Sequence, residues 1–393
     1  MIKKIIYFFI KLKLLNKYYI SKNYFFKIVR IKNNDLFFGY YDFDQLSQNQ
    51  QYLLALKKNE NSKDIEIGYY DVKNYDKFNK VVDTSSWSWQ LGNRLKWSQK
   101  YKNSFYYNHY NKKKKRSELV RFSIDKNTKE TFKNNFFDIS KDETFYISIN
   151  YGKLFKGRSN YGFKIEKNSY DYEDGILLNN FKHNSQSKLI ISLDQISKTK
   201  HFFSNSDSKD ISCFNHYLNH ISISPNSFNF LFFDCWNENN QRHSRIFIAD
   251  INGGFYYLKN LEFVSHYCWI DNHKILIFCK PFYKKIGFYI YNLKDKEFSI
   301  LKDLPNIDGH PSITKDGKSI IIDFYQNNFS YRKLISYNII TRKLNTIGFF
   351  YDNNYKKNSD VKCDLHSRPS NGNYITFDYP SNDFREIGIL KQK

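Results

Sequence analysis

Four segments in the second half of the chain repeat one pattern: a histidine opens a short strand, a turn follows, and a strongly apolar run comes next. The first is His220-Ile-Ser-Ile-Ser-Pro-Asn226, which leads to Phe230-Leu-Phe-Phe233. The other three begin at His266, His310 and His366, so successive histidines lie 46, 44 and 56 residues apart. A repeat of this length, with about four short strands in each unit, is typical of the blades of a β-propeller.

The rest of the chain supports this interpretation. A later strand of the unit recurs as Arg245-Ile-Phe-Ile-Ala-Asp250 and Gly287-Phe-Tyr-Ile-Tyr-Asn292, and residues 40–71, 87–122 and 138–200 hold weaker copies of the whole unit. We therefore expect an all-β fold, a β-propeller of seven or possibly six blades, over residues 35–393. A strand from residues near 35–40 would complete the last blade and close the ring.

Residues 1–34 differ from the repeats in being a basic amphipathic segment. Met1-Ile-Lys-Lys4 and the apolar run that follows resemble the start of a signal peptide, but Lys11 and Lys13 interrupt it and no small-residue cleavage site follows. We expect a short helical segment that packs on the propeller or rests on an anionic membrane surface. Five scattered cysteines without a C-x-x-C pair suit a reducing compartment, so the sequence predicts a cytoplasmic protein, possibly membrane-associated.

The composition excludes some classes of protein. The chain has 393 residues, 41% of them hydrophobic and 19% aromatic, which is too apolar for a disordered chain. Its 62 Lys and Arg against 39 Asp and Glu give a net charge of +23. Most of the basic residues are lysines, and the densest run, Lys112-Lys-Lys-Lys-Arg116, lies between two strand-like segments as a hairpin tip would. We expect no nucleic-acid partner.

The repeated histidines predict a common site. The first strand of each propeller blade lines the axial channel, so residues at one template position converge there. The candidate metal ligands are His220, His266, His310, Asp364 and His366. Imidazoles with a carboxylate can hold a divalent metal, and without a metal the ring and Arg94, which occupies the same position in an earlier blade, would attract the carboxylate or phosphate of a sugar. The alternative is that each histidine only hydrogen-bonds within its own blade.

Other residues are candidates for contact with a saccharide. An insertion at residues 151–163 and 171–175 predicts a long loop over one face, in which Lys156 and Arg158 would clamp an anion and Tyr161 would stack on a sugar. Trp236 is the best stacking candidate among the tryptophans, although blade core is the commoner role for such residues. The candidate substrate-binding residues are Gln90, Lys156, Tyr161, Trp236 and Asp308.

Two families resemble parts of the chain. The hairpins Ser224-Pro-Asn226 and Thr314-Lys-Asp-Gly317 resemble WD-repeat-like propellers of the TolB type. The order of Leu218-Asn-His220, Ser265-His266, His310 and Asp364-Leu-His366 is similar to that in oligogalacturonate lyases. That resemblance implies a seven-bladed propeller with Mn²⁺ held by histidines at the channel and an acidic saccharide as substrate. His266 and His366 then match ligand histidines, Asp364 falls where the family has a further histidine, and its glutamine ligand falls near Val361.

A third resemblance is to propeller-like proteins associated with bacterial surface-polysaccharide synthesis. It is carried by Phe38-Gly-Tyr-Tyr-Asp42, Trp87-Ser-Trp-Gln-Leu-Gly92, Val264-Ser-His-Tyr-Cys-Trp269 and Asp308-Gly-His-Pro-Ser312.

Two functions stay open. One is a carbohydrate-active, metal-dependent lyase-like enzyme that binds an acidic sugar or glycan precursor, with Arg94, Arg158 or Arg242 as candidate catalytic residues. The other is a non-catalytic scaffold for the protein partners of polysaccharide (glycosyltransferase) assembly.

Overall fold

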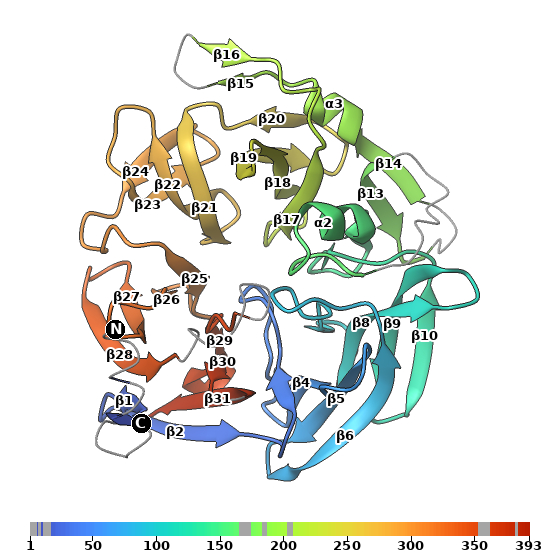
Figure 1. Ribbon diagram of the computed structural model, residues 1–393, viewed down its shortest axis with the longest axis vertical. Coiled ribbons are helices and arrows are strands. Elements are labelled where there is room, and N and C mark those ends of the chain that lie inside the picture. Colours follow the sequence, from blue (N-terminus) through green and yellow to red (C-terminus); the bar gives the residue numbers. More distant parts are fainter. Residues whose placement is uncertain are drawn as a thin grey trace.

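Seven antiparallel sheets are arranged around a central axis like the blades of a propeller (Figure 1). This computed structural model describes residues 6, 9–10, 17–164, 174–182, 187–202, 207–352, 362–381 and 384–393. The predicted all-β propeller is confirmed, and of the two blade counts considered, seven is correct.

The first three blades come from the first half of the chain. The first blade contains β3 (Asp35–Phe37), β4 (Tyr52–Lys58), β5 (Ile65–Asp71) and β6 (Asn74–Thr84). The second contains β7 (Lys96–Trp97), β8 (Ser104–Asn111), β9 (Arg116–Ser123) and β10 (Thr128–Phe132). The third contains β11 (Asp138–Ile139), β12 (Phe145–Ser148), β13 (Gly175–Asn180) and β14 (Ser187–Ser192).

The histidine-bearing repeats form the other four blades. The fourth contains β17 (Tyr217–Ile223), β18 (Asn229–Glu238), β19 (Gln241–Asp250) and β20 (Phe255–Tyr257). The fifth contains β21 (Leu261–Trp269), β22 (Lys274–Pro281), β23 (Gly287–Asn292) and β24 (Glu297–Ile300). The sixth contains β25 (Gly309–Ile313), β26 (Ser319–Phe324), β27 (Tyr331–Asn338) and β28 (Leu344–Tyr351). The seventh contains β29 (Arg368–Ser370), the 3-10 turn η3 (Asn371–Asn373), β30 (Tyr374–Pro380) and β31 (Arg385–Gln392).

The apolar runs of the repeats are the second strands of the blades. Ile320 and Ile322 of β26 and Phe230 and Phe232 of β18 are completely buried. A strand in the middle of a blade is covered on both faces by neighbouring blades, so it reads as a continuous apolar run without alternation.

The ring closes through a strand that lies upstream of the predicted one. β2 (Tyr24–Val29) pairs antiparallel with β31 as the outermost strand of the seventh blade, and β1 (Tyr18–Ile20) adds a fifth strand to the sixth blade beside β28. Residues 35–37 instead form β3, the innermost strand of the first blade. Part of the segment expected to precede the propeller therefore belongs to it, because exposed and half-buried residues alternate along β2 as an edge strand requires. Upstream, the described residues Ile6, Phe9 and Ile10 are helical.

The segment after β3 enters the axial channel. Tyr41 donates a hydrogen bond from its hydroxyl to the carbonyl of Tyr267 (2.8 Å), and the Tyr267 hydroxyl donates to the carbonyl of His220 (2.9 Å). Gly39 has a φ of 119°, and a Cβ there would lie 2.6 Å from the backbone nitrogen of Gly92. Only glycine allows this close backbone approach, which brings Tyr40 and Tyr41 to the axis.

The insertion of the third blade is partly helical. α2 (Tyr151–Gly157) begins where the Asn150 side chain accepts a hydrogen bond from the backbone of Lys153, and it packs against β17. Part of the predicted long loop is therefore a helix, and most of residues 171–175 lie outside the described residues. α3 (Leu193–Ser197) and the hairpin of β15 (His201–Phe202) and β16 (Ser208–Lys209) lie outside the ring of blades in Figure 1.

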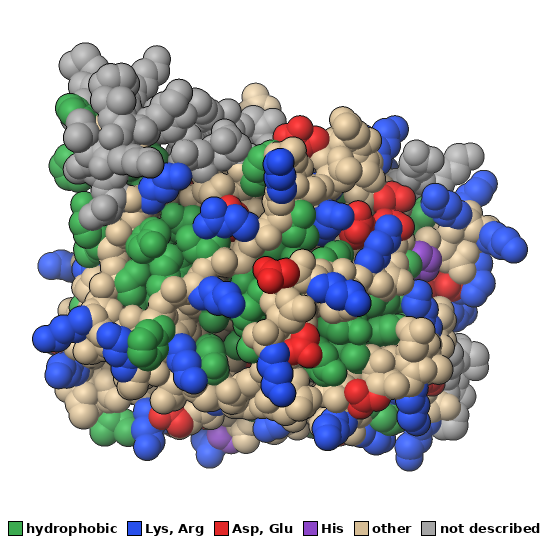
Figure 2. Space-filling model, turned by 90° about the horizontal axis from the view of Figure 1, so that it is seen from below, with side chains coloured by type: hydrophobic (Ala, Val, Ile, Leu, Met, Phe, Trp, Pro, Cys, Tyr) green, Lys and Arg blue, Asp and Glu red, His purple; other side chains and the backbone are tan. Residues whose placement is uncertain are grey.

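The basic residues are dispersed on the face shown in Figure 2. Lys and Arg side chains there alternate with acidic, polar and apolar ones and do not gather into one patch. Among the described residues, no helix combines the length and the hydropathy needed to cross a bilayer.

Candidate metal centre

Three of the four template histidines meet at the channel. His266 lies on β21, His310 on β25, and His366 two residues before β29. Their ring centroids are 4.2 Å apart for His266 and His310 and 4.6 Å apart for His310 and His366. Residues separated by 44 and 56 positions thus come into contact because each lies on, or just before, the innermost strand of its blade.

The fourth histidine, His220, is separated from the others by Tyr40. The Tyr40 ring stacks on His220 with centroids 5.0 Å apart and lies edge-on to His366, also at 5.0 Å. The predicted ring of four imidazoles is therefore a cluster of three, with the fourth imidazole, that of His220, held apart from it. The repeats alone could not show this, because the separating residue comes from a different part of the chain.

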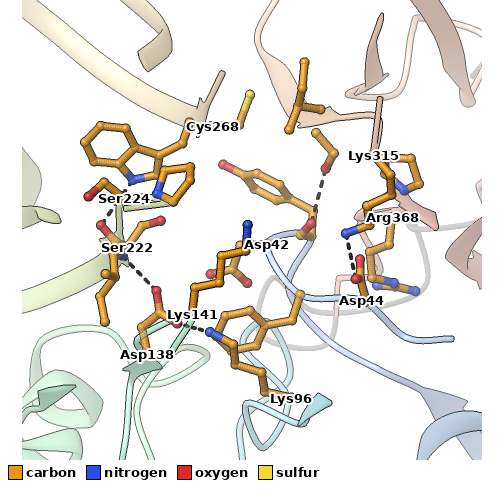
Figure 3. A pocket seen from close by; sticks show the side chains of 18 of the residues that line it. Asp42, Asp44, Lys96, Asp138, Lys141, Ser222, Ser224, Cys268, Lys315 and Arg368 are labelled. Atoms are coloured by element: carbon orange, nitrogen blue, oxygen red, sulfur yellow. Dashed lines mark hydrogen bonds and ion pairs between the residues drawn. The ribbon is translucent and has the colours of Figure 1, made fainter. Parts of the chain in front are cut away.

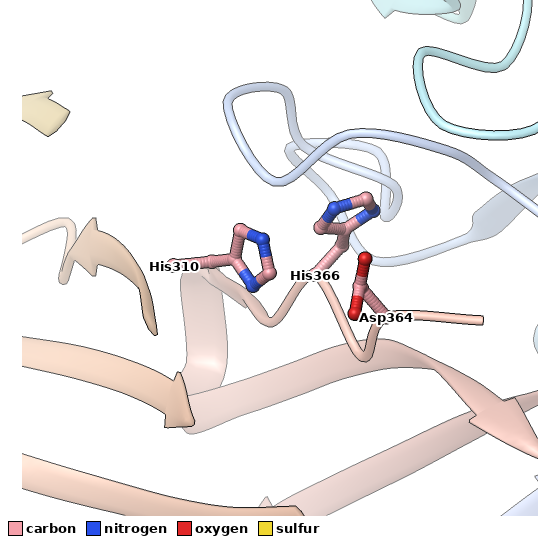
Figure 4. Close-up of side chains that lie close together, drawn as sticks. All are labelled: His310, Asp364 and His366. Atoms are coloured by element: carbon pink, nitrogen blue, oxygen red, sulfur yellow. The ribbon is translucent and has the colours of Figure 1, made fainter. Parts of the chain in front are cut away.

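Asp364 completes the cluster. The potential ligand atoms of His310, Asp364 and His366 all lie within 4.8 Å of one another (Figure 4). The Asp364 carboxylate also pairs with Arg332 (2.9 Å) and Lys362 (3.0 Å). Burial acts to raise its pKa, but these two cations hold the pKa well below the ordinary value, so Asp364 is ionised.

Hydrogen bonds fix how the three imidazoles face one another. Nδ1 of His310 lies 2.8 Å from the Asp323 carboxylate, and Nδ1 of His266 lies 2.9 Å from the Asp308 carboxylate. Nδ1 of His366 lies 2.9 Å from the carbonyl of Gly39. Since each acceptor takes the Nδ1 proton, the lone pair of every imidazole is on Nε2.

The Nε2 atoms distinguish a binding site from a structural one. Those of His310 and His366 are buried and have no hydrogen-bond partner among the described residues, while that of His266 is 3.5 Å from the Tyr325 hydroxyl. The alternative is that each histidine only hydrogen-bonds within its own blade. This accounts for the hydrogen bond at Nδ1 of His310, because Asp323 lies on the adjacent β26. It leaves the two Nε2 atoms unexplained.

The donor set fits a divalent cation. Nε2 nitrogens whose opposite Nδ1–H is held by a carboxylate or a carbonyl are the usual form of metal-bound histidine. Burial lowers the pKa of His266, and it lowers that of His366 well below the ordinary value, so both imidazoles are neutral near pH 7. The Nε2 atoms of His310 and His366, together with the ionised carboxylate of Asp364, suit Mn²⁺, Fe²⁺ or Zn²⁺. Val361, near which the resemblance places the family's glutamine ligand, has no donor atom for a metal and lies outside the described residues.

Two predicted residues support the cluster instead of facing a substrate. Asp308 holds His266 and also accepts a hydrogen bond from the Ser265 hydroxyl (2.8 Å). The Gln90 amide donates to the backbone carbonyl of Lys362 (2.9 Å), which fixes the chain next to Asp364.

Arg94 does not belong to an open site. Its two terminal nitrogens donate to the carboxylate of Asp42 at 2.8 and 2.7 Å, and its Nε donates to the carbonyl of Phe137 at 3.0 Å. The guanidinium is buried against the Phe43 ring. With its donors used in this way, Arg94 ties neighbouring blades together and is not placed to act as a base.

Arg158, Tyr161 and Arg242 lie on the His220 side of the channel. The Arg158 guanidinium stacks on the Tyr161 ring at 3.5 Å, and Tyr161 meets His220 edge to face at 5.4 Å. Arg242 is exposed on β19. Burial, together with the charges of Arg158 and Arg242, lowers the pKa of His220 well below its ordinary value. Neither arginine has an ion-pair partner within the part of the chain that the structure describes.

Lys156 and Trp236 lie in different surroundings. Lys156 is exposed on the last turn of α2. Trp236 is only 1% exposed, with its ring packed among His201, His216 and His243. The structure therefore places Trp236 in the core with no ring face open to a sugar, because the segment around α3 and β15 covers the outside of its blade.

Several important residues were not anticipated from the sequence. They are Tyr40, Tyr41, Asp323, Tyr325, Arg332 and Lys362. A signal existed for Asp323, since a carboxylate at the end of the apolar run Ile320-Ile-Ile322 is buried and needs a partner. The roles of Arg332 and Lys362 depend on pairing with Asp364 across strands and had no local signal.

Comparison with known proteins places the fold in a class. The chain matches no protein-family model and no curated protein sequence. It is similar to the solved structure of an oligogalacturonate lyase in complex with manganese, with a TM-score of 0.66 and 11% identity, over 94% of this chain and 93% of that one.

Two further structures share the architecture. An oligogalacturonate lyase from Vibrio parahaemolyticus has a TM-score of 0.61 at 11% identity and covers 96% of this chain and 98% of its own. The β-propeller domain of the Trilobed protease from Pyrococcus furiosus has a TM-score of 0.51 at 11% identity, over 92% of this chain and 94% of that one. At this identity the similarity establishes a propeller fold shared over nearly the whole chain.

Proposed function

We propose that the protein is a divalent-metal-dependent, lyase-like enzyme that acts on an acidic oligosaccharide at the histidine end of its channel. The observation that carries the proposal is the pair of buried Nε2 atoms on His310 and His366, which face the Asp364 carboxylate without hydrogen-bond partners among the described residues. Support for Mn²⁺ as the metal comes from the similar fold of a manganese-bound oligogalacturonate lyase.

The metal would be held by His310, Asp364 and His366, with His266 beside them. When bound, it would supply a positive charge that stabilises the carboxylate of a uronate as negative charge develops on the sugar. β-elimination removes the proton α to that carboxylate and expels the glycosidic oxygen from the next carbon.

The chain's own groups suit an acidic sugar. Arg158 and Arg242 present guanidinium groups without ion-pair partners among the described residues, and such groups bind carboxylates in a bidentate manner. Burial raises the pKa of Tyr325 well above its ordinary value, so its hydroxyl keeps its proton and can donate a hydrogen bond.

The test begins with the metal. Elemental analysis of the purified protein after exposure to Mn²⁺, Fe²⁺ or Zn²⁺ should find about one ion per chain, lost in His310→Ala and His366→Ala. His273→Ala, which changes a histidine on the turn before β22, should keep the metal. Absence of stoichiometric metal from the parent protein would reject the proposal and favour the non-catalytic scaffold.

Activity is tested separately. Oligogalacturonate should yield an unsaturated product that absorbs ultraviolet light, chelation should stop the reaction, and Mn²⁺ should restore it. Arg158→Gln should keep the metal and lose most of the reaction, because the uronate carboxylate loses a cationic partner. If Arg158→Gln retains full turnover, its role in binding the acidic sugar is wrong, whereas a metal-loaded parent that cleaves no acidic oligosaccharide contradicts the proposed reaction.

A further inference from the structure

A cavity lies at the end of the axis away from the histidines. It has a volume of about 330 Å³ and is formed where the innermost strands end and turn back into their blades (Figure 3). Gln99, Lys141, Pro225 and Lys315 line it from matching positions in the first hairpins of four blades. Tyr41 separates this cavity from the histidines, because it lines the cavity and its ring also lies 5.3 Å from that of His310.

Three lysines bring ammonium groups to the cavity. Lys96 donates to Asp138 at 2.6 Å and to a backbone carbonyl at 2.7 Å, and Lys315 pairs with Asp44 at 2.6 Å. Lys141 has no ion-pair or hydrogen-bond partner for its ammonium among the described residues, and Figure 3 shows its side chain extended toward the middle of the cavity. Each ammonium has three N–H donors, so the lysines leave several donors unused.

Each acidic side chain in the wall already has a cationic partner. Asp138 also accepts a hydrogen bond from the backbone of Ile223 (2.8 Å), and Asp42 is held by both terminal nitrogens of Arg94. Together with Asp44, all three carboxylates are already paired with a cation. The cavity therefore has a surplus of positive donors that a ligand with negatively charged oxygens would satisfy.

One side of the wall is apolar. Trp269 uses its indole N–H on the carbonyl of Ser222 (3.2 Å), so only the hydrocarbon of its ring is available. Pro225, Ile313 and Pro369 complete this side of the cavity. A pocket with a few charged donors and an apolar wall favours a ligand that combines an anionic group with a hydrophobic body.

We propose that this cavity is a second binding site, which takes a small organic oxyanion: a carboxylate or phosphate carried on a compact apolar body. Lys141 and Lys315 bind the oxyanion and the Trp269 side holds the body. The site involves none of the metal-ligand candidates, so it does not depend on the proposed enzymatic function.

Calorimetric titration of the full-length protein with phenyl phosphate and with phenylacetate tests the proposal. At least one should bind, and Lys141→Gln should weaken binding about tenfold, with a larger loss in the Lys141→Gln/Lys315→Gln double variant. Lys318→Gln, which removes a lysine from the same hairpin as Lys315 but outside the cavity, should bind as the parent does. The stronger of the two probes identifies the phosphate or the carboxylate as the preferred group.

Other outcomes would overturn the proposal. Failure of both probes to bind the parent protein, or undiminished binding to the double variant, would show that the lysines form no anion site. Inorganic phosphate binding as tightly as phenyl phosphate would contradict the apolar half of the site. Binding that persists in His366→Ala places the ligand away from the metal centre, whereas its loss there would refute an independent site.

Discussion

The position of one proton decides what each channel histidine can do. The acceptors at Nδ1 differ, a carboxylate for His266 and His310 and a carbonyl for His366, yet all three leave Nε2 as the free lone pair. The Asp323 carboxylate is itself held in place, because it also accepts hydrogen bonds from the backbone and hydroxyl of Ser367, both at 3.0 Å.

Replacing Asp323 with Asn should weaken metal binding by about 10- to 100-fold, because an amide no longer enforces the Nδ1–H form of His310. Competition with a metal-sensitive dye measures this change. Asp316→Asn, in the exposed turn of the same blade, serves as the control and should bind metal normally. Equal affinity of the two variants would show that the hydrogen bond does not tune the site.

Gly39→Ala should destabilise the protein by about 3 kcal/mol or more, because it combines a positive φ with a Cβ placed against the backbone of Gly92. Gly317→Ala is the matched control, with a φ of 69° and no atom within 4 Å of the new Cβ. That change should cost about 1 kcal/mol. Urea unfolding of the two variants measures the difference, and similar losses would mean that the contact between Gly39 and Gly92 relaxes easily.

At the scale of single elements, β2 is the strand that closes the ring of blades. It joins the start of the chain to β31 at the end, so the ring is closed by hydrogen bonds between residues more than 350 positions apart. Phe26 of this strand packs near Phe350 and Phe377, at centroid distances of 5.9 and 6.1 Å. Its neighbour Phe25 points outward and is 63% exposed.

Phe26→Ala should therefore lower the free energy of unfolding by about 2 kcal/mol, less than the loss for a fully buried Phe because Phe26 is half-buried. Phe25→Ala should change it by less than about 0.5 kcal/mol. Chemical denaturation of both variants gives the comparison. If the two substitutions have the same effect, the pairing of β2 in the last blade contributes little to closing the ring.

For the whole molecule, buried neutral histidines predict a dependence of stability on pH. Burial, with the charge of Arg245, lowers the pKa of His201 to about 4, while in the unfolded chain the pKa of this side chain is near its ordinary value of 6.5. Between these values the unfolded state binds more protons, so stability is complete above pH 6.5 and falls as the pH drops toward 4. The urea midpoint should decrease from pH 7 to pH 5, and by a smaller amount in His201→Phe. An unchanged pH dependence in that variant would contradict the low pKa of His201.

The sequence predicted most of the architecture and part of the site. The His-to-His repeat was sufficient for the propeller and for the convergence of His266, His310 and His366, because repeat position determines place in a ring. It could not predict that Tyr40 would separate His220 or that Arg94 would pair with Asp42. Those outcomes depend on contacts between segments outside the repeat, and a pattern of strands contains no information about them.

Tyr40 and Tyr41 have a consequence for how a polymer could be handled. Both rings contact His310, and Tyr41 also lines the cavity at the opposite end, so within the described residues the two ends of the axis are separated. A long polysaccharide therefore cannot pass along the axis from one face of the propeller to the other. A saccharide that reaches the histidines must enter and leave from the same side. This favours the cleavage of short fragments, or cleavage near a free end, over continuous sliding along a polymer.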